Sequence, residues 1–137
     1  MPDDVKAVLF DVDNTLFDRD RAQREVCSLI ISEFNDLFSG MDRDRITKAF
    51  LLSDEEATRL FAAGGGIETS RTGRSRRFLA ILGLNQDYAE QINRAYVRAY
   101  PLVDAPVDGA KAAVQQLADT FYLGVVSNGI PDVQYRK

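Results

Sequence analysis

Two short apolar runs, separated by a long stretch of helical periodicity, organise this chain. Residues 5–10 contain the run Ala7-Val8-Leu9-Phe10, and residues 122–126 repeat the pattern just before Ser127. Continuous apolar runs of this length predict strands that are covered on both faces, as in a parallel sheet. Two parallel strands need a crossover connection, and the amphipathic segment 107–119 is well placed to supply it.

Apolar residues recur at helical spacing between these strands. Helices are predicted over residues 18–38, around 46–50, from a capping box at Ser53 and Glu56 to the glycines at 64–66, over 71–82 with Gly83 as the cap, and over 86–100. The fold class is therefore predicted as α/β, with a partial Rossmann-like parallel sheet and an inserted all-helical domain. The predicted domains are a core of residues 1–17 and 102–137, and a helical domain of residues 18–101.

The composition of the 137 residues narrows the function classes. The net charge is −4 without a long basic run, which argues against nucleic acid as a partner. No signal-like N-terminus or bilayer-length apolar stretch is present, so we expect a cytoplasmic protein without a membrane partner. The absence of histidine excludes a histidine-dependent triad and a histidine-ligated zinc. The single cysteine, Cys27, lies among apolar residues and is predicted to be a small buried hydrophobe.

The stretch Asp11-Val12-Asp13-Asn14-Thr15-Leu16-Phe17 directly follows the first predicted strand. Ligands of open α/β sheets bind at the carboxyl ends of strands. Two carboxylates placed there repel each other unless a cation or a proton offsets the charge. A solvated acidic loop with Asn14 and Thr15 as turn formers is the alternative interpretation.

This stretch resembles the first motif of the haloacid dehalogenase superfamily, aspartate–x–aspartate–x–threonine. The resemblance implies that Asp11 attacks the substrate phosphorus and forms an aspartyl-phosphate. Asp13 would protonate the leaving oxygen and later take a proton from the hydrolytic water. The Asp11 carboxylate and the backbone carbonyl of Asp13 would also hold Mg²⁺, and Thr15 would keep the turn in shape.

The stretch Val125-Val126-Ser127-Asn128-Gly129 is similar to the second motif of the same superfamily. By this resemblance Ser127 and Asn128 bind the phosphate of the substrate, since a hydroxyl and nearby amides stabilise developing charge on phosphoryl oxygens. On its own, Ser-Asn-Gly is an ordinary turn. The helical insert resembles the cap domain of many members.

One basic cluster, formed by Arg71, Arg74, Arg76 and Arg77, lies in the helical insert. One of these arginines could contact a second anionic group of the substrate. The alternative is a solvated helix face without function. Either interpretation predicts that Arg74 and Arg77 are exposed.

The chain departs from the superfamily in lacking its lysine and later metal-binding aspartates. Lys137 falls too early in the sequence to match that lysine, and we do not assign it. The resemblance implies a Mg²⁺-dependent phosphomonoester hydrolase acting on a small phosphorylated metabolite, such as a nucleotide or sugar phosphate. Because the catalytic set is incomplete, the 137 residues alone are expected to be inactive.

Two other functions remain open at this point. One is a truncated, non-catalytic binding or interaction module. The other is a 2-haloacid dehalogenase, against which Asp13 counts because that reaction does not require the second aspartate. The open edge of the first strand is expected to pair with a second copy of the chain or with a complementing chain.

Overall fold

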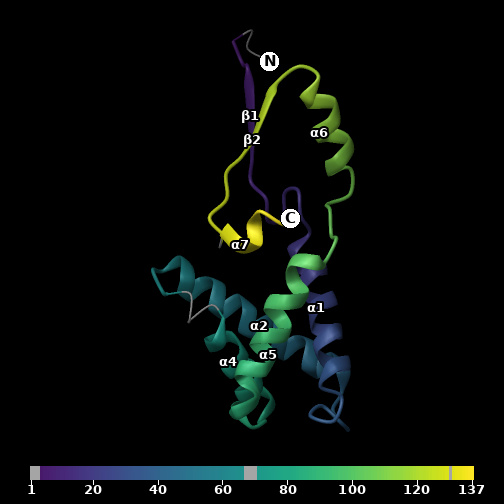
Figure 1. Cartoon of the computed structure of the whole chain (residues 1–137), viewed down its shortest axis with the longest axis vertical. Coiled ribbons are helices and arrows are strands. Elements are labelled where there is room, and N and C mark those ends of the chain that lie inside the picture. Colours follow the sequence, from purple (N-terminus) through teal and green to yellow (C-terminus); the bar gives the residue numbers. More distant parts are fainter. Residues whose placement is uncertain (1–3, 67–70, 130) are drawn as a thin grey trace. The chain divides into compact units, whose positions relative to one another are not determined.

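The computed structural model describes residues 4–66, 71–129 and 131–137 (Figure 1). The chain divides into two compact units: an α/β unit of the described residues up to Ala22 together with Pro101–Lys137, and a helical unit of Gln23–Tyr100. The first division therefore falls after Ala22, later in the chain than the predicted start of the helical domain. The Asp18 amide donates to the Ala105 carbonyl at 2.7 Å, and Arg21 Nη2 donates to the Pro106 carbonyl at 2.8 Å. These bonds hold the segment that precedes Gln23 to the α/β unit.

The α/β unit is built on two parallel strands, β1 (Ala7–Phe10) and β2 (Tyr122–Val125). Their register pairs Ala7 with Tyr122 and Phe10 with Val125. Helix α6 (Ala110–Ala118) leads into β2, and the short helix α7 (Pro131–Gln134) follows it (Figure 1). The strand–insert–helix–strand order and the parallel pairing confirm the predicted α/β fold class.

Large apolar side chains of both strands are exposed. Leu9 is 67% exposed, Tyr122 81% and Val125 59%. Apolar strands of this kind normally have layers on both faces. Among the described residues this cover is incomplete, as expected for a sheet of only two strands.

The helical unit contains most of α1 (Arg19–Glu33), then α2 (Arg43–Ala62), α4 (Thr72–Leu82), the 3₁₀ turn η1 (Gln86–Tyr88) and α5 (Ala89–Ala99). The 3₁₀ turn η2 (Tyr100–Leu102) spans the second division between the units. Aromatic rings form part of the core of this unit: Phe50 meets Phe78 edge-on at 5.4 Å between centroids, and Tyr96 stacks on Tyr100 at 5.2 Å. Gly83 ends α4 in the left-handed conformation, φ 72°, as the sequence predicted.

The helix predicted to begin at Ser53 does not begin there. Helix α2 runs unbroken from Arg43, and its N-cap is Asp42, whose carboxylate accepts from the Arg45 amide at 3.0 Å. Ser53 is buried within α2, and its hydroxyl donates to the Phe50 carbonyl at 2.7 Å. No glycine or proline separates the two predicted segments, so one buried face continues through both. Among the described residues, no helix combines the length and the apolar character that a bilayer span requires.

Candidate active site

The turn after β1 is closed by a backbone carbonyl. Val12 O accepts from the amides of Thr15 at 3.2 Å, Leu16 at 2.9 Å and Phe17 at 3.0 Å. Asn14 adopts a positive φ of 59°, which asparagine tolerates better than most residues. Buried Phe17 anchors the turn through bridges to Asp13 and Pro106. Thr15 thus takes part in the turn through its backbone amide, and its side chain is exposed.

The carboxylate of Asp13 lies in this turn between two residues from the C-terminal segment. Gln134 Nε2 donates to Asp13 Oδ2 at 3.0 Å, and Lys137 Nζ donates to Asp13 Oδ1 at 2.5 Å. The Lys137 side chain is 5% exposed and that of Asp13 27% exposed. The Lys137 ammonium also lies 4.7 Å from the centroid of the Phe17 ring, a cation–π distance. The Asp13 carboxylate therefore faces a cation, Lys137, and a neutral hydrogen-bond donor, Gln134.

Ser127 and Asp13 are brought together by a shared partner. The hydroxyl oxygen of Ser127, just past β2, accepts from the Gly129 amide at 3.2 Å and from Gln134 Nε2 at 2.5 Å. The same Nε2 contacts Asp13. Residues 121 positions apart in the sequence, Asp13 and Gln134, thus meet where both strands end.

The other two predicted site residues, Asp11 and Asn128, come just after the ends of β1 and β2. Asp11 directly follows Phe10, and the Val126 amide donates to the Phe10 carbonyl at 2.8 Å. Both Asp11 and Asn128 are exposed. Asp11 therefore follows the carboxyl end of β1, as Ser127 follows that of β2, and its side chain is exposed to solvent.

Gln134 and Lys137 contact Asp13, although neither was predicted as a site residue from the sequence. Gln134 is seven residues after Ser127 and belongs to no pattern that marks chemistry on its own. The short helix α7 turns the chain back, and this return puts both side chains against Asp13. A turn signal at Pro131 was the available hint in the sequence.

The donor set for a metal ion is partial. Within residues 4–66, 71–129 and 131–137, no three histidine, cysteine, aspartate or glutamate side chains gather as a metal cluster. Mg²⁺ commonly takes one or two protein carboxylates and retains several waters. The exposed carboxylate of Asp11 and the backbone carbonyl of Asp13 are the right kind of donor for such an ion.

Arg74 is not exposed, contrary to the sequence prediction. It is 6% exposed, its Nη1 lies 3.6 Å from Asp54 Oδ1, and its guanidinium carbon lies 3.4 Å from the centroid of the Tyr96 ring. Because α4 packs on α2 and α5, this position of the arginine cluster faces inward. Arg77 is exposed as predicted, and its Nε pairs with Glu56 at 2.7 Å.

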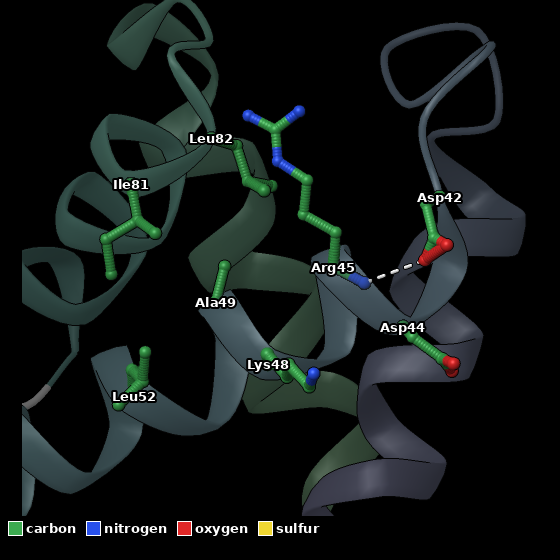
Figure 2. A pocket seen from close by; sticks show the side chains of 8 residues that line it. All are labelled: Asp42, Asp44, Arg45, Lys48, Ala49, Leu52, Ile81 and Leu82. Atoms are coloured by element: carbon green, nitrogen blue, oxygen red, sulfur yellow. Dashed lines mark hydrogen bonds between the residues drawn. The ribbon is translucent and has the colours of Figure 1, made fainter.

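A hollow of about 530 Å³ on the helical unit lies between α2 and α4 (Figure 2). Its rim carries the charged residues Asp42, Asp44, Arg45 and Lys48, and its wall carries Ala49, Leu52, Ile81 and Leu82. None of the residues with predicted chemistry lines it.

Comparisons with known proteins agree with this fold. The profile of the haloacid dehalogenase-like hydrolases matches residues 5–137. Among solved structures, a protein assigned as a HAD-hydrolase, YfnB from Bacillus subtilis, bound to magnesium, is 23% identical with a TM-score of 0.81. The match covers 96% of this chain and 57% of YfnB. L-2-haloacid dehalogenase from Xanthobacter autotrophicus is 21% identical with a TM-score of 0.58, over 96% of this chain and 50% of that enzyme.

The chain thus spans between half and three fifths of the length of these solved relatives. No curated protein sequence matches it. At these identities the solved structures establish the fold, and the sequence profile, which extends over nearly the whole chain, establishes the family. This chain belongs to the haloacid dehalogenase-like hydrolases.

Proposed function

We propose that the chain carries the nucleophile and the phosphate-binding serine of a Mg²⁺-dependent phosphomonoester hydrolase. The observation that supports it best is the shared contact of Asp13 and Ser127 with Gln134 at the ends of β1 and β2. A carboxylate that protonates the leaving oxygen and a hydroxyl that binds a phosphoryl oxygen must both reach the same phosphate group. Two side chains held by one amide meet that requirement.

The reaction is a double displacement at phosphorus. A carboxylate oxygen of Asp11 bonds to phosphorus while the bond to the leaving alkoxide breaks, and protonated Asp13 gives its proton to that oxygen. Water then attacks the phosphorus of the aspartyl-phosphate and gives a proton to Asp13, while the bond between phosphorus and the Asp11 oxygen breaks. Inorganic phosphate leaves, and both carboxyl groups return to their starting state.

Charge on the transferring group is the main obstacle to this chemistry. The Ser127 hydroxyl would donate to a phosphoryl oxygen, and the backbone around Asn128 would approach it closely. The Asp11 carboxylate and the backbone carbonyl of Asp13 would hold Mg²⁺, which would offset the charge of the phosphoryl oxygens. The substrate class is a small phosphorylated metabolite, such as a nucleotide or sugar phosphate.

A 2-haloacid dehalogenase is the second candidate, because one of the solved relatives is an L-2-haloacid dehalogenase. In that reaction Asp11 would displace halide from carbon, and no group would need to protonate a leaving alkoxide. The presence of Asp13 favours the phosphatase, because the dehalogenase reaction does not require a second aspartate.

The test requires a polypeptide of the relatives' length that contains these 137 residues. It is assayed with para-nitrophenyl phosphate plus Mg²⁺ and, separately, with 2-chloropropionate. Release of inorganic phosphate that stops with EDTA supports the phosphatase. Chloride release without phosphate release assigns the dehalogenase, and neither product, with a folded protein, favours a non-catalytic module.

A further inference from the structure

The hydroxyl of Ser127 has both of its accepting positions filled. A serine hydroxyl has one proton to donate and two lone pairs to accept with. The Gly129 amide and Gln134 Nε2 both point at this oxygen, at 3.2 and 2.5 Å. Backbone and side-chain N–H groups can donate but cannot accept, so both contacts use the lone pairs of Ser127.

Resting on the proposed function, we infer that Gln134 is a positioning residue that fixes the Ser127 hydroxyl as a hydrogen-bond donor toward phosphate. With its lone pairs occupied, the hydroxyl has only its proton left for a ligand. Phosphoryl oxygens accept hydrogen bonds, so a hydroxyl oriented in advance to donate stabilises them without reorganisation. A serine with free lone pairs would spend part of its time in orientations that repel an anion.

The second N–H of the same amide holds Asp13. Gln134 Nε2 lies 3.0 Å from Asp13 Oδ2, so the two hydrogens of one amide group serve the two partners. This arrangement ties the carboxylate after β1 to the hydroxyl after β2. Gln134 therefore acts through Asp13 and Ser127 and need not contact the substrate itself.

Gly129 makes room for this contact. A Cβ built at Gly129 would overlap the amide and side-chain carbons of Gln134. Gly129 is not among the described glycines with positive φ, so the turn itself does not demand glycine for its backbone conformation. The glycine of Ser-Asn-Gly is thus explained by the approach of Gln134, and Gly129→Ala should displace the amide.

The inference is tested on the 137-residue chain by titrating ¹⁵N-labelled protein with inorganic phosphate in excess Mg²⁺. The amide signals of residues 127–129 report binding. Gln134→Leu is expected to weaken phosphate binding about tenfold, the scale of one hydrogen bond to a charged group. Gln134→Asn, whose shorter side chain cannot span both partners, should weaken it as well and serves if the leucine variant misfolds. Gln116→Leu, on the exposed surface of α6, is the matched control and should bind like wild type.

A double-mutant cycle separates positioning from a general structural role. If Gln134 acts through Ser127, Gln134→Leu should have little further effect in a Ser127→Ala background. Additive losses, unchanged affinity in the Gln134 variants, or no saturable phosphate response in wild type would each overturn the inference. Phosphate binding that follows this pattern in a longer polypeptide without phosphatase turnover would contradict the proposed function and leave the role of Gln134 standing.

Discussion

Arg74 and Asp54 form an ion pair of 3.6 Å inside the helical unit, with side chains that are 7% and 5% exposed. Arg74→Ala removes the cation beside buried Asp54 and leaves the carboxylate with neutral donors such as Gln23 Nε2, and breaking a buried pair in this way costs about 3–5 kcal/mol. Arg74→Ala should lower the free energy of unfolding by this amount, measured by urea denaturation. The loss of its contact with the Tyr96 ring acts in the same direction.

Arg77→Ala is the matched control for that experiment. Arg77 also pairs with a carboxylate, that of Glu56, but its side chain is 57% exposed. An exposed pair of this kind contributes about 0–1 kcal/mol. Equal destabilisation by the two substitutions would show that burial of the Arg74 pair has no energetic consequence.

This pair also marks a limit of the sequence analysis. Four arginines within seven positions predict a solvated helix face, and that prediction holds for Arg77 but fails for Arg74. The burial of Arg74 depends on Asp54, twenty positions earlier, and on the Tyr96 ring. Local spacing carries no information about such long-range partners.

The elements themselves were largely predictable because their signals are local. The apolar runs located β1 and β2, and Gly83 marked the end of α4 through its backbone conformation. The break predicted before Ser53 was wrong because a capping-box pattern also fits the interior of a helix whose buried face continues. In the site, Asp13 and Ser127 came from motifs, whereas Gln134 and Lys137 depend on how α7 turns back.

Burial raises the pKa of the Cys27 thiol from 9.0 to about 11. The folded state therefore retains the thiol proton more strongly than the unfolded state does. The resulting contribution to stability is intact below pH 9 and is lost as the pH rises toward 11. Wild type should thus lose more unfolding free energy than Cys27→Ser between pH 8 and 11. Parallel pH profiles of the two proteins would contradict this.

The exposed apolar side chains of β1 and β2 should cause two copies of the chain to associate. Leu9 and Tyr122 present exposed apolar side chains on one face of the paired strands and Val125 on the other, and exposed apolar surface of this kind is typically covered. We expect concentration-dependent dimerisation in equilibrium sedimentation of the 137-residue chain. Leu9→Lys should weaken it, while Leu52→Lys, an equally apolar exposed position on the helical unit, should not. A monodisperse monomer at all concentrations would refute the expected pairing.

Asp13→Asn should remove the group that transfers protons while keeping the hydrogen bond from Gln134. An asparagine oxygen can still accept from Gln134, so the contact at the ends of the strands is retained. Loss of the acid–base group should lower kcat for para-nitrophenyl phosphate by about 10²–10⁴, with a much smaller change in KM, in a polypeptide of the relatives' length. Asp108→Asn, at an exposed position of the α/β unit, should leave kcat unchanged. A fall in kcat of less than threefold for Asp13→Asn would remove Asp13 from the mechanism.

The central claim is that Asp11 becomes covalently phosphorylated. The same longer polypeptide is incubated with para-nitrophenyl phosphate and Mg²⁺, quenched with borohydride during turnover, digested and analysed by mass spectrometry. Borohydride reduces an acyl phosphate to an alcohol, so an aspartyl-phosphate is recovered as homoserine. The account predicts homoserine at position 11 in wild type, and neither homoserine nor turnover in Asp11→Asn. Turnover that persists in Asp11→Asn, or trapping at another residue, would contradict it.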